Sequence, residues 1–254
     1  MLNLSMTSLS NLRPNLHQRL IGMALAILFL AFFGMNAEAQ SFYKEKVPRE
    51  NYLQAGFGPS FVYADNGGAL GRLDFNVRPA FSVSYGRSIK PILDIRATVG
   101  YQFYKSREAS YYNSSIINEW ADANQAIEST SNIIFADIMP TFSLFKQEGH
   151  TYRNSVNLYA GAGLGFLMAI SSETMLKNEG TYMENKVRPA VYIPVRGGVS
   201  YRLDLYSDIS LEGGMLMSLS DKIDGVQNYN AFTDILFQGK VVYRRYLSKF
   251  TGVN

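Results

Sequence analysis

The stretch Ser155 to Ile170, SVNLYAGAGLGFLMAI, alternates two kinds of residue and carries no charge on either. Its even-numbered positions are all apolar, whereas its odd-numbered positions begin with Ser, Asn and Tyr and continue with three glycines between 161 and 165. A period of two is typical of a β-strand, whose successive side chains point to opposite faces. A helix is excluded, because these glycines would cost about 1 kcal/mol each there. The stretch therefore predicts a strand with one wholly apolar face and one small or polar face.

Seven further segments show the same alternation, and no stretch of comparable length has the periodicity of a long helix. The eight segments are 51–63, 76–87, 93–105, 132–145, 155–170, 187–203, 208–219 and 231–246. Their linkers alternate in length: 64–75, 105–131, 171–186 and 220–230 are long and polar, whereas 88–92, 146–154 and 204–207 are short. An even number of strands with long loops at one end and tight turns at the other is the layout of a transmembrane β-barrel. We predict an all-β fold over 51–250, an eight-stranded antiparallel up-and-down barrel with both termini on the periplasmic side.

The first 39 residues have the features of a secretory signal peptide. Arg13 and Arg19 precede an uncharged apolar run over residues 20–35, and Ala-Glu-Ala at 37–39 is a small-x-small cleavage signal. Sixteen apolar residues are short for a membrane-spanning anchor, which is the alternative. We expect cleavage before Gln40, which leaves 40–50 as a periplasmic segment ahead of the barrel.

Composition excludes several classes of function. The net charge of +3 is too small to argue for a nucleic-acid partner, and no block of like charges is present. Without cysteine the chain has no disulfide, no thiolate nucleophile, no cysteine-based metal site and no lipoprotein anchor. A chain of 254 residues with 47% hydrophobic residues can bury one sizeable core.

The polar face of the predicted strands is crowded with small residues. They are Gly56, Gly58, Ser82, Ser84, Thr98, Gly161, Gly163, Gly165, Ser200, Ser210 and Gly214. A soluble barrel would place large apolar residues inside and Lys, Glu and Asp outside. Small residues instead suit a narrow lumen, so we assign the apolar face to outer-membrane lipid, the first expected partner.

Charges of both signs fall on the same polar phase. They are Arg78, Asp94, Arg96, Asp137, Arg188, Arg196, Arg202, Glu212, Asp234, Lys240 and Arg244. Inside an eight-stranded barrel these side chains are forced into pairs, because an isolated charge in a low-dielectric interior costs several kcal/mol. We predict a lumen charge network. Two interpretations remain open: the network holds the lumen closed, or it forms a proton or ion path.

Aromatic residues and prolines complete the strand pattern. Tyr85, Tyr101, Phe103, Tyr201 and Tyr243 lie on the apolar face near strand ends, where interfacial aromatic belts are found. Prolines within the strands remove ladder hydrogen bonds, so we expect some of them to mark bulges or strand ends. These prolines are Pro59, Pro79, Pro140, Pro189 and Pro194.

With its signal peptide, its strand number and its unequal linkers, the chain resembles the small eight-stranded outer-membrane β-barrel proteins of the OmpA and OmpX type. The resemblance covers about residues 48–250 and rests on no diagnostic motif. It implies a multi-pass integral outer-membrane protein of a Gram-negative bacterium. One departure is the C-terminus: members usually finish on an aromatic residue of the last strand, whereas this chain continues through Phe250 to Asn254.

No catalytic or cofactor motif stands out. Gly161-x-Gly163-x-Gly165 is not a nucleotide-binding loop. The motif G-x-G-x-x-G would require Gly where Phe166 stands and the start of a helix after it. The glycines are better explained as room for neighbouring side chains. We predict no enzyme, no cofactor and no metal, since the mature chain has a single histidine, His150, in a turn assigned to the periplasmic side.

The longest loop, 105–131, is the candidate partner-binding site. It carries Tyr111, Tyr112 and the single tryptophan, Trp120. Ile116, Trp120, Ala123 and Ile127 follow helical spacing and predict a short amphipathic helix across the barrel mouth. Aromatic residues on loops commonly anchor interfaces, so an extracellular or membrane protein partner is expected here. Alternatively, the loop packs its own apolar side onto the rim.

We therefore predict a monomeric outer-membrane barrel with a structural or interaction role through its extracellular loops. A narrow channel or transporter for small or hydrophobic solutes is the first alternative, although an eight-stranded lumen filled with side chains argues against a wide pore. An accessory component of a secretion system is the second.

Overall fold

The structure, a computed structural model, describes residues 50–65, 75–108, 113–145, 154–177, 180–220, 223–226 and 233–247. All of them belong to one compact unit, Glu45–Asn254. The predicted signal peptide, residues 40–49, Tyr111, Tyr112 and His150 lie outside the described residues.

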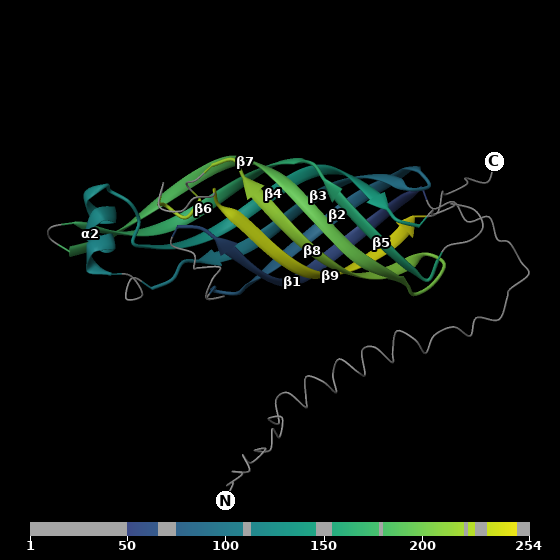
Figure 1. Cartoon of the computed structure of the whole chain (residues 1–254), viewed down its shortest axis with the longest axis horizontal. Helices are drawn as coiled ribbons and strands as arrows, with labels where there is room; N and C mark the ends of the chain where they lie inside the picture. Colours follow the sequence, from purple (N-terminus) through teal and green to yellow (C-terminus); the bar gives the residue numbers. More distant parts are fainter. Residues whose placement is uncertain are drawn as a thin grey trace, which may run out of the picture. The chain divides into compact units, whose positions relative to one another are not determined.

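The fold is a closed antiparallel sheet (Figure 1). Its elements are β1 (Asn51–Tyr63), β2 (Arg78–Lys90), β3 (Leu93–Lys105), α2 (Ser114–Asp122), β4 (Glu128–Ser143), β5 (Val156–Ala162), β6 (Leu164–Lys177), β7 (Gly180–Arg202), β8 (Ser207–Ser218) and β9 (Ile235–Leu247). Consecutive strands pair with each other except β5 and β6, which both pair with β4 and β7, and β1 pairs with β9 to close the ring. β5 and β6 lie end to end between β4 and β7 and together take the place of one strand. The nine strands therefore form a barrel of eight. The predicted eight-stranded up-and-down barrel is confirmed.

Two prolines explain why the opening stretch is divided into β5 and β6. The β4 register places Pro140 opposite Ala162, and the β7 register places Pro194 opposite Gly163. Neither proline has an N–H to donate. The strand between them therefore lacks a backbone hydrogen bond from β4 and one from β7 at adjacent residues. The Gly163 N–H still donates to the Pro194 carbonyl, at 3.1 Å.

The other prolines also lie where the ladder stops. The pairing of β1 with β9 is interrupted between Phe57 and Ser60, and Pro59 lies in this gap. Pro79 lies beyond the last paired residue between β2 and β3, and Pro189 lies above the end of β8. The expectation that some prolines mark irregularities or strand ends is confirmed by Pro59 and Pro79, whereas Pro189 lies inside β7 and is paired with Met168 of β6.

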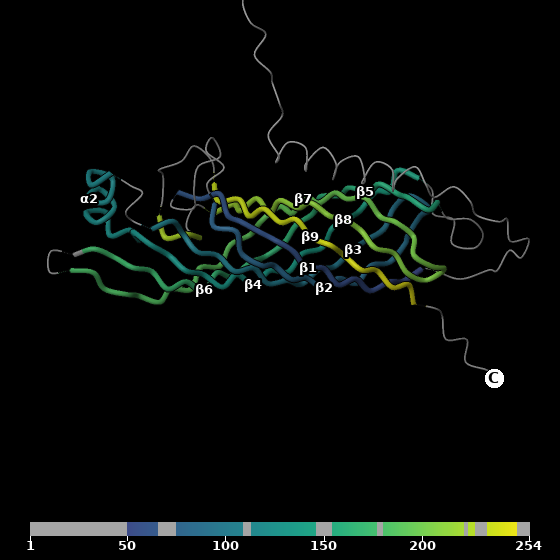
Figure 2. The backbone as a smooth tube through the Cα atoms, turned by 90° about the horizontal axis from the view of Figure 1, so that it is seen from below, coloured from purple at the N-terminus to yellow at the C-terminus, as the bar shows by residue number. Residues whose placement is uncertain are grey.

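The prediction of a long loop over 171–186 was wrong. β6 continues to Lys177 and β7 begins at Gly180, and the two strands pair along this whole length. This hairpin extends past the ends of the other strands (Figure 2). The outer part of this hairpin shows no alternation of apolar and polar residues in the sequence. The reason is that Gly180 to Asn185 are exposed on both faces of the hairpin, so neither face has to be apolar. β4 likewise begins earlier than predicted, at Glu128.

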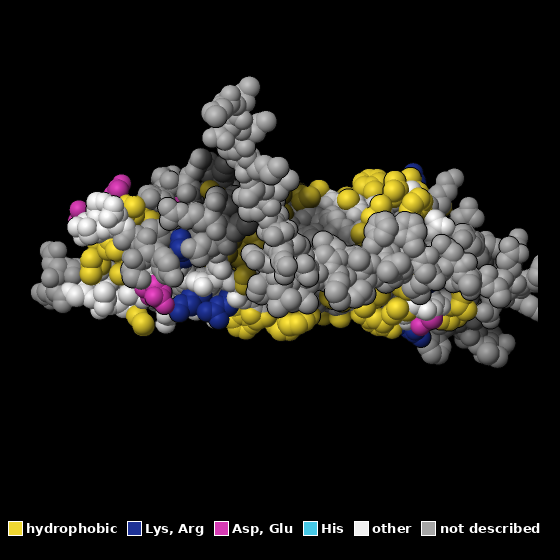
Figure 3. Space-filling model, turned by 60° about the horizontal axis from the view of Figure 1, so that its bottom comes forward, with side chains coloured by type: hydrophobic (Ala, Val, Ile, Leu, Met, Phe, Trp, Pro, Cys, Tyr) yellow, Lys and Arg dark blue, Asp and Glu magenta, His cyan; other side chains and the backbone are white. Residues whose placement is uncertain are grey.

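Burial follows the predicted alternation. Leu164 is 66% exposed, whereas Leu167, on the opposite phase, is fully buried. Figure 3 shows hydrophobic side chains gathered over the strands, with charged side chains towards both ends. An apolar exterior around a filled interior is the arrangement of a transmembrane barrel of the outer-membrane type. No helix in the described part of the chain is long and apolar enough to cross a membrane.

Candidate functional site: the filled lumen and the loop end

The lumen has two levels. We call the end of the barrel with Asn51 and Leu247 the turn end, and the end with α2 the loop end. Inward side chains nearer the turn end are mostly charged residues and tyrosines, whereas those nearer the loop end are mostly apolar. Most strands supply both levels, so the inner face of each of these strands changes its character along its length, whereas β5 supplies only the turn-end level and β6 only the loop-end level.

The first charged cluster joins β4 and β7. Nη1 and Nη2 of Arg196 lie 2.7 and 2.5 Å from the two carboxylate oxygens of Asp137. The hydroxyl of Tyr192 donates to the same carboxylate at 2.6 Å. Arg196 and Asp137 are both buried, so this bidentate pair is shielded from bulk water. Burial of both charges makes each strongly dependent on the other.

The second cluster surrounds Glu212 of β8. Arg96 Nη1 of β3 lies 2.6 Å from its carboxylate, and the Tyr159 hydroxyl of β5 donates to it at 3.0 Å. Lys240 Nζ lies farther from it, at 3.8 Å, and donates to Ser82 Oγ at 3.0 Å. Contacts across the lumen therefore tie together strands that are not neighbours in the ring.

The third cluster is built around Arg244 of β9. Its guanidinium carbon lies 4.5 Å from the Tyr52 ring centroid, 5.6 Å from that of Tyr159 and 5.9 Å from that of Tyr246. These distances permit cation–π attraction. The hydroxyls of Tyr52 and Tyr246 donate to Asp94 and Asp208, respectively. Thus each of the three clusters joins buried carboxylates to tyrosine hydroxyls.

The large inward rings are accommodated by glycines directly across the sheet. The register pairs are Tyr52 with Gly86, Phe135 with Gly100, Tyr159 with Gly198 and Tyr192 with Gly165. A Cβ on Gly165 would lie 2.5 Å from the Tyr192 ring, and one on Gly198 would lie 2.8 Å from the Tyr159 ring. The interpretation of Gly165 as room for a neighbouring side chain is therefore confirmed. Gly161 and Gly163 differ, because a Cβ there would collide with the carbonyl oxygens of Pro140 and Ile138.

The loop-end level is a hydrophobic core. Its members are Val62, Ala64, Tyr104, Ile133, Phe135, Leu167, Ala169, Ala190, Tyr192, Leu216, Ile223 and Leu236. Tyr192 belongs to both levels, because its ring packs edge-on to Phe135 while its hydroxyl reaches Asp137. The prediction that the lumen is lined by small and polar residues therefore does not describe this apolar core, although the buried side chains of Ser129, Ser131 and Ser171 lie near it towards the loop end.

The structure brings seven of the eleven predicted charged residues together at the turn-end level. They are Asp94, Arg96, Asp137, Arg196, Glu212, Lys240 and Arg244. The other four lie elsewhere: Arg78 is exposed, and Arg202 is partly exposed opposite Asp208. Arg188 makes a bidentate pair with Glu173 at the loop end. Asp234 accepts the Ile223 N–H at 2.7 Å, also at the loop end.

Sequence reasoning missed the tyrosines and two carboxylates of the lumen. Tyr52, Tyr159, Tyr192 and Tyr246 share the inward phase with the predicted charges, so their phase was a usable signal. The missed carboxylates are Asp208, at the start of its strand, and Glu173, which fell in the segment predicted to be a loop.

The predicted helix within 105–131 is present in part as α2, which ends at Asp122 and so leaves Ala123 and Ile127 outside it, and it does not lie across the mouth. Both views place it beside the outer part of the β6–β7 hairpin (Figures 1 and 2). Trp120 is only 2% exposed, so its indole is not available as a surface anchor. The core is covered instead by Ile223 and Val226, and the Ala126 N–H donates to the Gly225 carbonyl at 3.2 Å.

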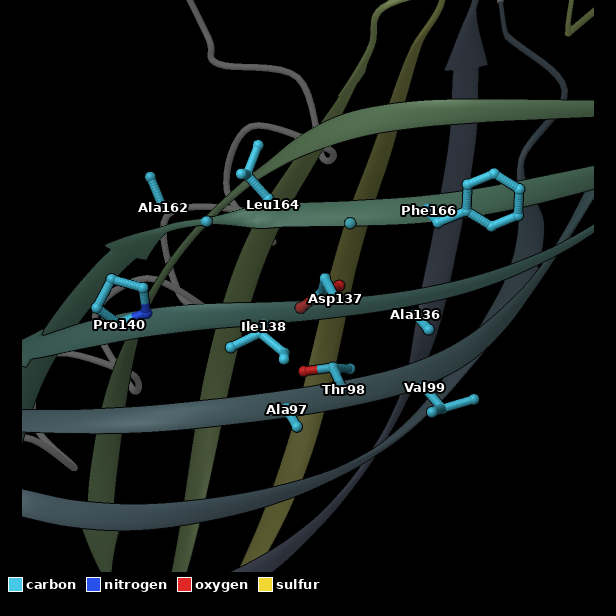
Figure 4. A pocket seen from close by; sticks show the side chains of 12 residues that line it. Ala97, Thr98, Val99, Ala136, Asp137, Ile138, Pro140, Ala162, Leu164 and Phe166 are labelled. Carbon is cyan, nitrogen blue, oxygen red and sulfur yellow. The ribbon is translucent and has the colours of Figure 1, made fainter.

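A hollow of about 980 Å³ lies beside the β5–β6 interruption on the lipid-facing side (Figure 4). Small side chains form its floor, among them Ala97, Ala136 and Ala162, while Leu164 and Phe166 border it. Its lining also includes Asp137, a carboxylate that is buried and paired with Arg196. Within the described residues, no three acidic or histidine side chains are close enough to hold a metal ion.

The chain is similar to known proteins in structure but not in sequence. No protein-family model matches it, and no curated protein matches its sequence. Among solved structures, Neisserial surface protein A is 13% identical with a TM-score of 0.46, over 78% of this chain and 97% of that one. Outer membrane protein OprG from Pseudomonas aeruginosa is 7% identical with a TM-score of 0.44, over 80% and 99%.

A third structure is Ail, the attachment invasion locus protein of Yersinia pestis, in complex with the heparin analogue sucrose octasulfate. It is 11% identical with a TM-score of 0.42, over 78% of this chain and 98% of Ail. These likenesses concern the fold, and at such identities they assign no function.

Proposed function

We propose that this transmembrane barrel is an outer-membrane scaffold that does not conduct solutes and presents its loop end, on the extracellular side, to other proteins. The single observation that carries the proposal is a lumen filled at two successive levels. The turn-end level is occupied by buried ion pairs and tyrosines, and the loop-end level by a hydrophobic core with Ile133, Leu167 and Leu216 fully buried.

The loop end offers a surface that membrane insertion alone does not require. The β6–β7 hairpin stands beyond the other strands and exposes Tyr182 and Met183, the latter by 78%. Glu184, Lys186 and Arg188 add charges of both signs to the same hairpin. Exposed segments held on a rigid scaffold commonly carry function, so the contact surface assigned to the loops is best placed on this hairpin.

The proposal includes the predicted export route. Residues 1–39 are removed as a signal peptide, 40–50 remain in the periplasm, and the monomeric barrel enters the outer membrane with both termini inside. N-terminal sequencing of the mature protein is expected to begin at Gln40. A retained N-terminus in the purified membrane protein would contradict this part of the proposal.

Photo-crosslinking in intact cells tests the interaction role. A photoreactive residue at Met183 is expected to form adducts with protein, because this side chain stands in the aqueous phase. The matched control is Leu211, which is 68% exposed but faces lipid, and which is expected to form no such adducts. Replacing 174–187 by a tight turn should abolish the Met183-dependent partner while the barrel keeps its heat-modifiable gel mobility. Absence of protein adducts across the hairpin would contradict the proposed role.

One observation favours the narrow-channel alternative. Nε and Nη2 of Arg96 and Nε of Arg196 are buried without a hydrogen-bond partner among the described residues. Such donors are suited to water, so the turn-end level can be hydrated. The hydrophobic core at the loop-end level argues against a continuous path, and recordings of conductance in planar bilayers distinguish the two functions.

A further inference from the structure

β7 is much longer than the strand that covers one of its edges. β8 ends at Ser218, opposite Tyr192, and the last bond between these strands runs from the Leu219 N–H to the Val191 carbonyl at 2.9 Å. β7 continues outward to Gly180 and remains paired with β6 on its other side. Within the described part of the chain, the β8-side edge of β7 is therefore free from Gly180 to Ala190.

The direction of the backbone groups along this free edge follows from the alternation of an antiparallel ladder. The Val191 carbonyl points towards β8, whereas the Pro194 carbonyl points towards β5 and β6, where it accepts the Gly163 N–H. The register of β6 with β7 is constant. The backbone N–H and C=O groups of the odd-numbered residues between Val191 and the outer end of β7 therefore also point to the free edge. Thr181, Met183, Asn185 and Val187 consequently each present an N–H and a C=O there.

Within the described part of the chain, this edge has only some of the features that protect exposed strands. Proteins commonly block such edges with proline, charged side chains, bulges or covering loops. Here Pro189 blocks the base and Lys186 and Arg188 carry charge, but the register shows no bulge farther out. Gly180 to Asn185 are all exposed, and Met183 and Val187 add apolar surface next to the free backbone groups.

We infer that the free edge of β7 binds an extended segment of a partner protein by β-strand addition, an inference that rests on the proposed interaction role. Main-chain hydrogen bonds to Thr181, Met183, Asn185 and Val187 give the affinity, and the side chains around them give the selectivity. The added strand runs antiparallel to β7 and continues the line of β8.

A partner segment fits this edge better than a second copy of the chain. Copies inserted into one membrane have the same orientation, so their β7 strands run in the same direction. Pairing them edge to edge would give a parallel ladder, which is slightly less stable per residue. A separate extended segment is free to adopt the antiparallel direction that β8 already uses.

The test uses the purified full-length barrel in lipid nanodiscs and a short soluble peptide of alternating threonine and valine with lysine at both ends. Hydrogen exchange is expected to slow on peptide binding at the amides of Thr181, Met183, Asn185 and Val187. The even-numbered amides between them already bond to β6 and are expected to stay unchanged. Slowing of both sets alike, or of neither, would overturn the inference.

A variant and a modified peptide separate backbone pairing from side-chain contact. Met183→Pro removes a donor from the free edge without removing a bond to β6, and should weaken peptide binding about tenfold, or about 1.4 kcal/mol. Met183→Val changes the side chain but keeps the donor, and should bind within about twofold of the parent protein. A peptide N-methylated on its pairing amides should not bind the parent protein, a result that requires no variant to fold.

The outcomes distinguish this inference from the proposed function. Protein adducts in cells without protection of the odd-numbered amides would overturn strand addition but keep the interaction role. Peptide binding at those amides without any adduct in cells would overturn the interaction role but keep the edge as a binding site. Protection that rises with barrel concentration in the absence of peptide would show that a second copy occupies the edge, and would overturn the inference.

Discussion

The turn-end and loop-end levels of the lumen fill the same barrel by different means. At the turn end, Arg196 and Asp137 or Arg96 and Glu212 must meet with fixed geometry, because an unmatched buried charge is costly. At the loop end, Ile133, Leu167 and Leu216 need only close packing and removal from water. We propose that the charged level fixes contacts between particular strands, whereas the apolar level closes the lumen.

The largest expected effect comes from breaking the charged level. Asp137→Ala leaves the Arg196 guanidinium buried without its counter-charge and should lower the free energy of unfolding by about 3–5 kcal/mol. Urea titration of the barrel in lipid vesicles, followed by gel mobility, measures the change. Replacing both partners, as Asp137→Leu with Arg196→Met, should cost clearly less. Equal costs for the single and double variants would refute the importance of the pairing.

The apolar level should respond to loss of volume. Ile133→Ala creates a cavity beside Leu167 and should cost about 2–5 kcal/mol in the same titration. The control, Leu211→Ala, removes a lipid-facing side chain whose place lipid can fill, so its cost should be smaller. If both variants lost the same stability, the interior at Ile133 would not be a packed core.

Glycines that face rings connect the two levels. A Cβ on Gly86 would overlap the Tyr52 ring at the charged level, and one on Gly100 would overlap Phe135 at the apolar level. Each Gly→Ala change should cost about 1–3 kcal/mol through overpacking. We expect the larger cost at Gly86, because displacing Tyr52 also disturbs its bond to Asp94. Gly239→Ala is the control, since its Cβ would meet nothing within 4 Å, and a similar loss there would contradict this explanation.

The smallest expected effect is that of one hydroxyl. Tyr159→Phe removes a donor to Glu212, which keeps its ion pair with Arg96, and should cost about 0.5–1.5 kcal/mol. Combining it with Arg96→Met should cost more than the sum of the two single changes, because both groups stabilise one carboxylate. Simple additivity in this double-mutant cycle would show that the contacts act independently.

The barrel itself could be predicted from sequence because a period of two reports which face of a strand is buried. Leu164 and Leu167 follow their predicted faces. The same period does not report which level of the lumen a residue occupies, so the core around Ile133 was not distinguished from the charged level. The outer hairpin was missed because its strands stand in water, where neither face needs to be apolar.

Pairing within the lumen lies beyond local sequence patterns. Arg96 and Glu212 are 116 positions apart, and their meeting depends on the closure and the tilt of the whole sheet. Arg188 is a second example. Its position in the alternation placed its side chain on the inward face, but its partner, Glu173, lies in a segment that was predicted to be a loop. Trp120 followed helical spacing as predicted, yet only tertiary packing decides that its ring faces inward.

Conductance across a planar bilayer reports whether two successive fillings close the lumen. We expect no ion conductance for the purified parent barrel. We also expect none for Asp137→Ala that has been shown to be folded, because the apolar level around Ile133 and Leu216 remains intact. Reproducible current steps from the parent barrel that change in size with Asp137→Ala would contradict this expectation and establish the charged level as part of an open path.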